Sequence, residues 1–410
     1  MTMNSNSTEP MAGAAMPGRA RGSRLGEALL QRVLAGIESG RLTVVVPGGR
    51  QFSRRGARPG PEATLELHRW RALRRLLGGG DIGFARAYAD GDWSSPDLAA
   101  LLELAAHNVP HVEKALGALL PVRLWNRLRH GVRGNSRGGS RRNIAFHYDL
   151  GNEFYRLWLD ASMSYSSALY SRPDQSLEEA QQAKLDRAVA LLDLKGGESV
   201  LEIGCGWGAL AAALARRGAE VTGLTLSREQ LAWAQAMVAA EGLSGRVKLR
   251  YEDYRDVTGR FDRIVSVEMI EAVGERYWPA YFQALRDRLK AGGTAVLQVI
   301  TIAEDRFEAY RRNTDFIQQY IFPGGMLPTR AILAEQARRA GLELAHSECF
   351  GESYARTLHE WRRRFLLTWP QAARLGFPEE FRRLWEYYFC YCEGGFRAGA
   401  IDVGFYTLKG

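Results

Sequence analysis

The residues best suited to chemistry in this 410-residue chain begin with a glycine-rich loop. The strand-like run Ser199–Ile203 leads into Gly204-Cys205-Gly206-Trp207-Gly208, and an alanine-rich segment follows. Glycines at alternate positions allow a sharp turn and close approach of a ligand at a helix N-terminus. The spacing differs from the dinucleotide pattern GxGxxG, and the next strand ends in Leu224-Thr225-Leu226-Ser227, without the acid that holds a nicotinamide ribose. The loop therefore predicts a cofactor other than NAD.

Two glutamates, Glu268 and Glu271, follow the apolar segment 261–267 and stand three residues apart. Just past a strand end, both can face one cleft. Glycosidase chemistry uses such carboxylate pairs, but the glycine loop argues against that reading. The pair Cys390 and Cys392 has the wrong spacing for a CxxC redox or zinc site, so we expect no metal and a reduced, cytoplasmic protein.

The elements that must position these residues alternate between strand-like and helix-like patterns. This alternation is typical of a doubly wound parallel α/β sheet. The predicted segments are 198–203, 209–217, 220–226, 228–240, 246–251, 261–267, 277–290 and 293–302.

The chain before this sheet is basic and has its own apolar segments. Residues 1–142 carry 22 Arg and Lys against 11 Asp and Glu, while the whole chain has a net charge of +9. We predict a disordered tail over 1–23, a smaller α+β domain associated with lipid or membrane over 24–108, a basic linker over 109–142 and a catalytic domain over 143–410. The excess of arginine indicates an anionic surface as partner. No long apolar run predicts a membrane span.

Several motifs, taken together, resemble the cyclopropane-fatty-acid synthase family of class I methyltransferases. The resemblance covers roughly 143–408, and GDIGFARAYADGDWSSPDLAALL is similar to the N-terminal extension of the longer bacterial members. The motifs, in chain order, are FHYDLGNEFYRLWLD, MSYSSALY, LEIGCGWGALA, VTGLTLSREQ, DYRD, FDRIVSVEMIEAVG, IFPGGMLP and SYARTLHEW.

The resemblance implies S-adenosylmethionine as cofactor. It places the methionine end against the glycine loop, with two residues closing over it, and the ribose and adenine against the ends of the following strands. The implied cofactor residues are Tyr165, Ser166, Glu202, Gly204, Gly206, Thr225, Leu226, Gln230, Asp253 and Tyr254.

The implied reaction is methyl transfer to an alkene, which passes through a carbocation that must be stabilised, shielded from water and deprotonated. The resemblance places aromatic and acidic groups around the reacting carbons and a bound bicarbonate as the base. The bicarbonate would contact the backbone near Ser167 and Ile300 and the side chains of Glu271, Gln298 and Tyr354. The residues implied at the reacting centre are Tyr148, Ser167, Glu271, Gln298, Ile300, Phe322 and Tyr354.

Three positions depart from many relatives. Ser167 stands where many bacterial members have Cys, and Gln298 where many have His. Glutamine can donate a hydrogen bond to the anion but cannot relay a proton. Glu268 stands where shorter members often have Gly.

We therefore expect transfer of a methylene unit to the cis double bond of an unsaturated phospholipid acyl chain, forming a cyclopropane ring. Methyl transfer without ring closure, giving a methyl-branched or methyl-unsaturated chain, is the alternative within the enzymes. A catalytically silent protein that binds membrane lipid is an alternative of another class. The expected partner is the anionic inner face of the cytoplasmic membrane, with no nucleic acid, and a homodimer is a further expectation.

Overall fold

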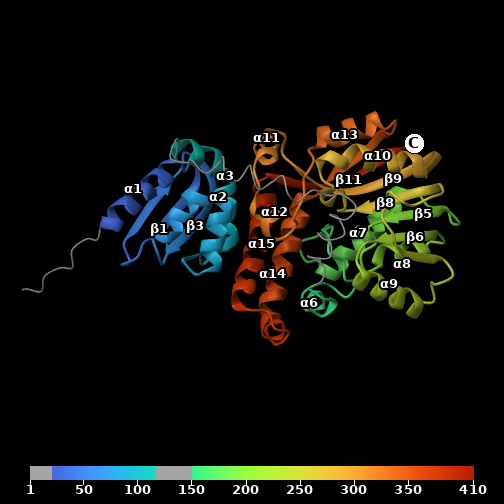
Figure 1. Cartoon of the computed structure of the whole chain (residues 1–410), viewed down its shortest axis with the longest axis horizontal. Helices are drawn as coiled ribbons and strands as arrows, with labels where there is room; N and C mark the ends of the chain where they lie inside the picture. The colour runs from blue at the N-terminus through green and yellow to red at the C-terminus, as the bar shows by residue number, and fades with distance from the viewer. Residues whose placement is uncertain (1–20, 117–149) are drawn as a thin grey trace, which may run out of the picture.

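The structure, a computed structural model, describes residues 21–116 and 150–410, with side chains from residue 26 onward. Tyr148 and most of the predicted tail and basic linker lie outside the described residues. Figure 1 shows a small N-terminal unit in blue beside a larger unit, with two long helices from the C-terminal part of the chain between them. None of the described helices is long and apolar enough to cross a bilayer.

The N-terminal unit is a four-stranded sheet packed with three helices. Its strand order is β2-β1-β3-β4, and β1 and β3 run parallel. Alternate residues such as Leu42, Val44 and Leu65 are buried, as the period of a strand with one covered face requires. Its elements are α1 (Arg21–Ala35), β1 (Ser39–Val45), β2 (Gln51–Arg55), β3 (Arg58–Leu67), α2 (Arg71–Ala89), β4 (Trp93–Ser94) and α3 (Leu98–Leu116).

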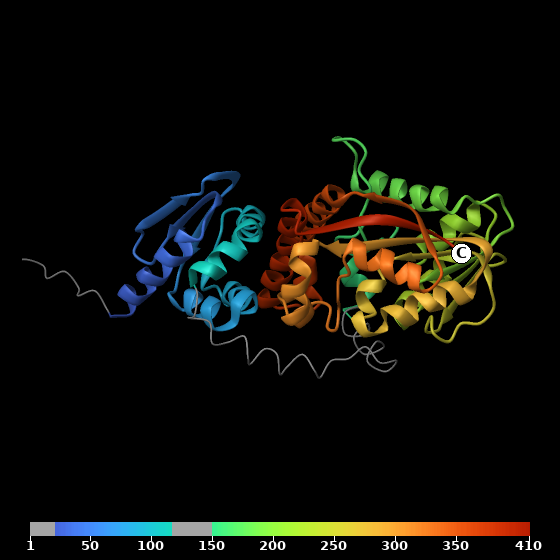
Figure 2. The same cartoon turned by 90° about the horizontal axis from the view of Figure 1, so that it is seen from above.

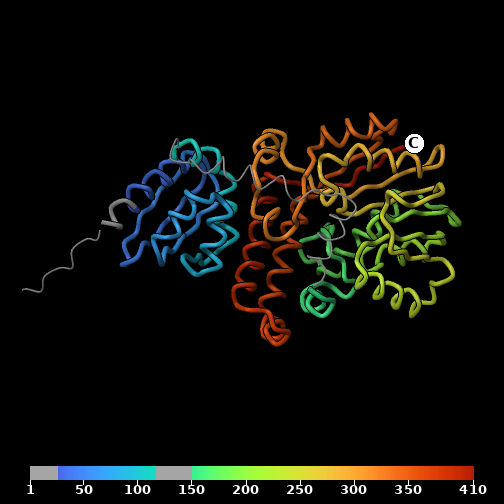
Figure 3. The backbone as a smooth tube through the Cα atoms, viewed as in Figure 1, coloured from blue at the N-terminus to red at the C-terminus, as the bar shows by residue number. Residues whose placement is uncertain are grey.

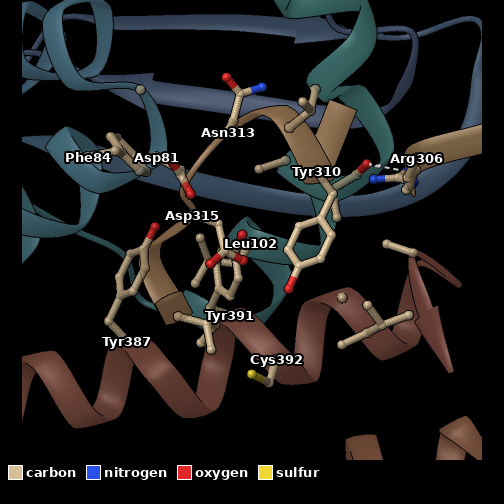
Figure 4. A pocket seen from close by; sticks show the side chains of 18 of the residues that line it. Asp81, Phe84, Leu102, Arg306, Tyr310, Asn313, Asp315, Tyr387, Tyr391 and Cys392 are labelled. Carbon is tan, nitrogen blue, oxygen red and sulfur yellow. Dashed lines mark hydrogen bonds between the residues drawn. The ribbon is translucent and has the colours of Figure 1, made fainter. Parts of the chain in front are cut away.

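Helix α2 is bent at a run of three glycines. Gly80 has φ 58° and ψ −140°, which lies outside helical geometry and favours glycine. Beyond the bend the second half of α2 returns against the first half. A Cβ on Gly83 would stand 2.0 Å from the carbonyl oxygen of Arg75, so only glycine permits this approach. Just after the bend, Asp81 and Phe84 lie on the side of α2 that faces the larger unit (Figure 4).

The larger unit is built on a seven-stranded sheet of order β10-β11-β9-β8-β5-β6-β7. The five strands from β9 to β7 are parallel, as the alternating pattern predicts. The elements of this sheet and its helices are α6 (Asn152–Arg156), α7 (Leu177–Leu192), β5 (Ser199–Ile203), α8 (Ala209–Arg216), β6 (Glu220–Thr225), α9 (Arg228–Ala240), β7 (Val247–Tyr251), β8 (Phe261–Val267), η2 (Ile270–Ala272), η3 (Glu275–Tyr277), α10 (Trp278–Arg288), β9 (Leu289–Ile302), α11 (Glu304–Arg312), α12 (Phe316–Tyr320), α13 (Arg330–Arg339), β10 (Glu343–Cys349), α14 (Gly351–Arg374), α15 (Glu379–Arg397) and β11 (Ile401–Lys409).

The α/β fold of a class I methyltransferase is confirmed, with one feature that the parallel pattern did not predict. Strand β11 runs antiparallel to both β9 and β10, because the chain returns to the sheet from the end of α15. Helices cover both faces of the sheet (Figure 2). One core cluster joins α7 and α8 to the sheet, and a second joins α10 and α13 to its other face.

Helices α14 and α15 form a hairpin that joins the two units (Figure 3). Helix α15 packs against α3, and a Cβ on Gly394 would lie 2.6 Å from the backbone nitrogen of Glu103. Arg383 donates through Nε to the carbonyl of Tyr88 at 2.7 Å, and the Tyr88 hydroxyl donates to Glu386 at 3.1 Å. The N-terminal unit therefore packs directly on the hairpin that also forms one wall of the catalytic region.

Candidate active site

The glycine loop forms an open cradle at the carboxyl end of β5. Gly204, Gly206 and Gly208 have φ of 85°, 51° and 93°, in the left-handed region that favours glycine. The N–H groups of Gly204 and Cys205 donate to the carbonyl of Leu224 at 3.0 and 2.8 Å, which fixes the loop against β6. A Cβ on Gly206 would meet no heavy atom within 4 Å, so space is open beside the loop.

Glu202 lies on β5 immediately before this cradle. Its side chain is buried, and its Oε2 has no hydrogen-bond partner within the protein. Burial raises the pKa of Glu202 to about 8, although Lys184 opposes the shift. A buried oxygen without a partner, next to an open loop, is available to a polar group of a ligand. The cradle and this oxygen fit S-adenosylmethionine, whose ammonium and ribose hydroxyls are hydrogen-bond donors.

The residues at the end of β6 that are predicted to hold the ribose and adenine lie close together and are linked by hydrogen bonds. The Thr225 hydroxyl donates to the amide oxygen of Gln230 at 3.0 Å and accepts from the Ser227 N–H at 3.1 Å. Ser227 in turn caps α9 by accepting from the Gln230 N–H at 3.2 Å. Leu226, between them, is partly exposed. These contacts fix the β6–α9 turn beside the glycine loop.

At the end of β7, Asp253 is held by its neighbour Arg255. The two guanidinium nitrogens Nε and Nη2 donate to the carboxylate at 2.8 and 2.6 Å, and the Arg255 N–H adds a third bond. Tyr254 packs edge-on against Tyr281 with ring centroids 5.5 Å apart. Burial raises the pKa of Tyr254 to about 12, so its hydroxyl stays neutral. Asp253 therefore orders the loop on which Tyr254 lies.

Tyr165 and Ser166 come from the segment between α6 and α7. The Tyr165 hydroxyl is 3.0 Å from that of Tyr388 on α15, which links this segment to the helical hairpin. The Ser166 hydroxyl accepts from the ammonium of Lys184 at 2.8 Å. Ser166 is therefore a positioning residue for a buried cation, a contact that the sequence resemblance does not suggest.

Lys184, on α7, is the functional residue that sequence reasoning missed. It is buried, and burial lowers its pKa, while the carboxylates of Glu268 and Glu202 oppose that shift. A lysine on an amphipathic helix is usually exposed, but helical spacing places Lys184 on the same face of α7 as Leu177, Ala180 and Ala188, which is the buried face. The lysine lies where a positive charge stabilises the neighbouring carboxylates.

Glu268 stands at the centre of the predicted reacting site. Its φ of 46° lies in the left-handed region, which is unusual for a residue with a side chain and favours glycine. Its Oε1 accepts from the Ser167 N–H at 2.8 Å and from the Gln298 amide at 2.7 Å. Its Oε2 accepts from the Tyr354 hydroxyl at 2.7 Å. Burial raises the pKa of Glu268, and the three donors and Lys184 oppose this rise.

Glu271 lies on η2 next to Glu268. Its Oε1 accepts from the Ile300 N–H at 2.6 Å, and its Oε2 has no partner within the protein. Burial raises the pKa of Glu271 to about 8, and the like charge of Glu268 adds to the rise. Two neighbouring carboxyls share one charge when repulsion prevents both from ionising. Glu268 holds that charge because it has three donors, and Glu271 keeps its proton at neutral pH.

The Ser167 backbone, Gln298 and Tyr354, which the resemblance implies as donors to a bicarbonate, lie together around the Glu268 carboxylate. All three groups donate to Glu268, and the remaining donor, the Ile300 N–H, is bonded to Glu271. A second anion would have no member of this donor set and would meet the negative charge of the pair. The expected donors therefore converge on one point, where Glu268 accepts their hydrogen bonds, and the bicarbonate itself stays a prediction.

The reacting site opens into a cavity of about 820 Å³. Glu268, Glu271, Ile300 and Tyr354 line it, as does Phe322, whose ring lies edge-on to Tyr388 at 6.3 Å. The lining is mostly apolar, so the cavity suits a hydrocarbon chain. Tyr148, predicted at the reacting centre, lies outside the described residues. Among the described residues, no cluster of His, Cys, Asp or Glu is placed to hold a metal ion.

The family described as "Mycolic acid cyclopropane synthetase" matches residues 136–405. The chain belongs to this family. It is 42% identical, over 84% of its length and 83% of the relative's, to "Tuberculostearic acid methyltransferase UfaA1" of Mycobacterium tuberculosis. It is 37% identical to "Cyclopropane-fatty-acyl-phospholipid synthase" of Escherichia coli, over 81% of this chain and 84% of that one.

Solved structures give the same result for the catalytic region. The cyclopropane synthase MmaA2 from Mycobacterium tuberculosis matches 66% of this chain and 98% of its own, with TM-score 0.62 and 31% identity. The mycolic acid cyclopropane synthase CmaA1, solved with SAH and CTAB, matches with the same coverage, TM-score 0.62 and 32% identity. The protein is therefore an S-adenosylmethionine-dependent enzyme that methylates or cyclopropanates lipid acyl chains.

Proposed function

We propose that this enzyme transfers a one-carbon unit from S-adenosylmethionine to the cis double bond of an unsaturated phospholipid acyl chain. We further propose that Glu268, rather than a bound bicarbonate, accepts the proton that the reaction releases. One observation carries this proposal: the Glu268 carboxylate takes the hydrogen bonds of Ser167, Gln298 and Tyr354 inside an apolar cavity.

The reaction begins at the alkene. S-adenosylmethionine supplies an electrophilic methyl group when it is bound. The alkene π electrons form the new carbon–carbon bond while the C–S bond breaks toward sulfur, and a carbocation remains on the acyl chain. Tyr165, Tyr354 and Phe322 line the cavity, and aromatic rings favour a neighbouring cation. The apolar wall keeps water away from the cation.

The proton then leaves the transferred methyl group. Its C–H bonding electrons form the third ring bond, and the proton passes to the Glu268 carboxylate, which gives a cyclopropane. Three donors hold Glu268 in position, and together with the positive charge of Lys184 they oppose the rise in its pKa that burial causes. A fixed carboxylate in a dry site also attracts the carbocation before deprotonation.

A second product begins from the same cation. A hydride shift moves the charge to the methyl-bearing carbon, and loss of a methyl proton to Glu268 leaves a methylene branch instead of a ring. The similarity to a tuberculostearic acid methyltransferase supports the methylene-branched chain as a second candidate product. Both products have the same mass, so the acyl chains must be distinguished by their proton NMR signals, which differ for ring and alkene hydrogens.

The substrate in this proposal is presented by an anionic membrane to which the enzyme binds peripherally on the cytoplasmic side. The basic N-terminal third of the sequence supports this, with seven arginines between Arg123 and Arg142. That segment lies outside the described residues. Replacing Arg127, Arg129 and Arg133 with Gln is expected to weaken sedimentation with phosphatidylglycerol vesicles more than with phosphatidylcholine vesicles. Equal loss on both, or no loss, contradicts this part of the proposal.

The identity of the base is tested by removing the Glu268 carboxylate and supplying bicarbonate in its place. Wild-type turnover on unsaturated phosphatidylglycerol vesicles should be unchanged when carbon dioxide is removed from the buffer. Glu268→Gly should be nearly inactive in that buffer, because its donors lose their acceptor, and should recover when bicarbonate is added. Glycine tolerates the left-handed φ at this position. Loss of wild-type activity in bicarbonate-free buffer, or no rescue of Glu268→Gly, contradicts Glu268 as the base.

A further inference from the structure

The cavity that begins at the two glutamates does not end in the catalytic region. Its lining continues past α12 and α15 and reaches the core of the N-terminal unit, where Leu42, Val44 and Leu65 form part of the wall. Figure 4 shows side chains from both units around its middle, with Asp81, Phe84 and Leu102 on one side and Tyr387, Tyr391 and Cys392 on α15 on the other. One continuous space therefore joins the reacting site to the second unit.

The N-terminal end of this cavity is aliphatic. The residues that line it come from α1, β1, β3 and α3, and include Leu30, Val33, Leu42, Val44, Leu65 and Leu104. Asn108 is the buried polar side chain there, and its amide is fully used. Its oxygen accepts from the N–H groups of Glu38 and Ser39, and its nitrogen donates to the carbonyls of Ser39 and Leu104. Glu113 on α3 also lines the cavity with an exposed side chain, and the other lining residues from α1, β1, β3 and α3 are apolar.

The charges along the cavity also exclude an anionic group. Arg306 is the only cation among the described residues that line it, and its Nη2 donates to the carbonyl of Ala106 at 2.9 Å. Asp81 and Asp315 face the middle of the cavity (Figure 4). Burial raises their pKa values to about 6 and 7, so near neutral pH Asp81 is mostly ionised and Asp315 is partly ionised. A phosphate headgroup inside would lose its hydration without gaining a partner.

We propose that the N-terminal unit binds the methyl-terminal part of the acyl substrate, from the double bond held at Glu268 to the chain end between β1, β3 and α3. The proposal rests on the proposed function of the catalytic site. The headgroup remains outside, and the N-terminal unit measures the length of chain beyond the double bond. Because the methylenes leave a bilayer that is as apolar as the cavity wall, the cavity selects chain length by fit and not by removing the chain from water.

Two leucines on the same face of β3 provide a matched test. Leu65 and Leu67 are both buried, but only Leu65 is among the cavity-lining residues. Leu65→Phe should shorten the cavity, and Leu67→Phe should not. Both variants are compared on phosphatidylglycerol vesicles whose acyl chains have the double bond at a fixed distance from the carboxyl group and methyl-side segments of different length.

The expected result is a change in length preference. Leu65→Phe should lower kcat/KM at least tenfold for the longest methyl-side segments and leave the shortest nearly unaffected. Leu67→Phe should keep the wild-type profile, and both variants should bind S-adenosylmethionine normally. If both variants lose activity uniformly across the series, or if the carboxyl-side length controls the effect, the proposal is wrong.

A binding measurement separates this inference from the proposed function. A monounsaturated fatty acyl probe with a diazirine at its methyl end is photolysed on the full-length enzyme, and labelled peptides are identified by mass spectrometry. Labels should fall within residues 30–65 and 101–112, whereas a diazirine beside the carboxyl group should not label them. Labelling of the N-terminal unit without any turnover of double bonds would contradict the proposed function but support the binding site. Turnover with labels confined to residues 150–410 would contradict acyl binding by the N-terminal unit and leave the proposed function in place.

Discussion

The two ends of the cavity satisfy their polar groups in different ways. At the catalytic end, three donors from separate segments converge on the Glu268 carboxylate, and Glu271 keeps one oxygen without a partner. At the N-terminal end, the Asn108 amide forms hydrogen bonds only with backbone groups, and the wall around it is aliphatic. The first arrangement prepares charge for a reaction, whereas the second selects only shape and length. Substitutions at the two ends should therefore affect different kinetic quantities.

The largest effect is expected for Glu268→Gln. Glutamine has nearly the same shape but cannot accept the proton, so turnover should fall by roughly 10²–10⁴, the range for a general base. S-adenosylmethionine affinity, measured by calorimetry, should be unchanged. Glu275→Gln, which removes a partly exposed partner of Arg311, is the matched control. A Glu268→Gln enzyme with near-wild-type turnover would show that the base lies elsewhere.

Glu271 should be less sensitive to the same change at neutral pH. Its pKa of about 8 means that the carboxyl is already largely neutral, and glutamine imitates that form while still accepting from the Ile300 N–H. Glu271→Gln should therefore cost clearly less than Glu268→Gln when both are measured below about pH 7. A greater loss in Glu271→Gln would mean that Glu271 carries the functional charge.

Tyr354→Phe should have an intermediate effect. The variant removes one of the three donors to Glu268, and turnover should fall by about 10², as for loss of one preorganised hydrogen bond. Because this hydrogen bond lowers the pKa of Glu268, its loss should raise that pKa. The acidic limb of the kcat profile should then move to higher pH. Tyr354 also stacks on Phe396 with ring centroids 4.6 Å apart, and a loss of turnover without this shift would indicate damage to that packing.

The cofactor cradle is tested by Gly206→Val. The substitution adds a side chain to the open space beside the loop and should weaken S-adenosylmethionine binding by more than about tenfold, or ~1.4 kcal/mol. Gly242→Val is the control, because Gly242 also has a positive φ of 70° and open space around its Cβ but lies at the end of α9. Equal affinity in the two variants would exclude Gly206 from the cofactor site.

The sequence predicts the local features of this molecule better than its long-range contacts. The five parallel strands and the glycine loop follow from periodicity and spacing within short segments. Strand β11 was not predicted, because its antiparallel place between β9 and β10 depends on the path of α14 and α15. Glu268 was noticed as a departure, but its role depends on donors 101, 30 and 86 residues away in the chain. Lys184 was missed although helical spacing places it on the apolar face of α7 with Leu177 and Ala188.

The smallest effect concerns the middle of the cavity, where the two compared ends meet. Asp315 caps α12 by accepting from the Gln318 N–H at 2.8 Å, and burial and the charge of Asp81 raise its pKa to about 7. Because the folded protein holds this proton more tightly than the unfolded chain, the group's contribution to stability is full at acidic pH. That contribution is lost as pH rises through about 7. Repulsion between Asp81 and Asp315 then opposes the contact between the two units.

Asp315→Asn removes this titration and keeps the cap, because asparagine is also a favoured N-cap residue. The free energy of unfolding of the variant should therefore fall less between about pH 5 and pH 8 than that of the wild type. Each pKa unit that folding adds corresponds to about 1.4 kcal/mol, which urea titrations resolve. Asp287→Asn, at an exposed position on α10, should reproduce the wild-type slope. If the free energy of unfolding of Asp315→Asn falls with pH as steeply as that of the wild type, the charge of the carboxyl pair does not couple the N-terminal unit to the catalytic region.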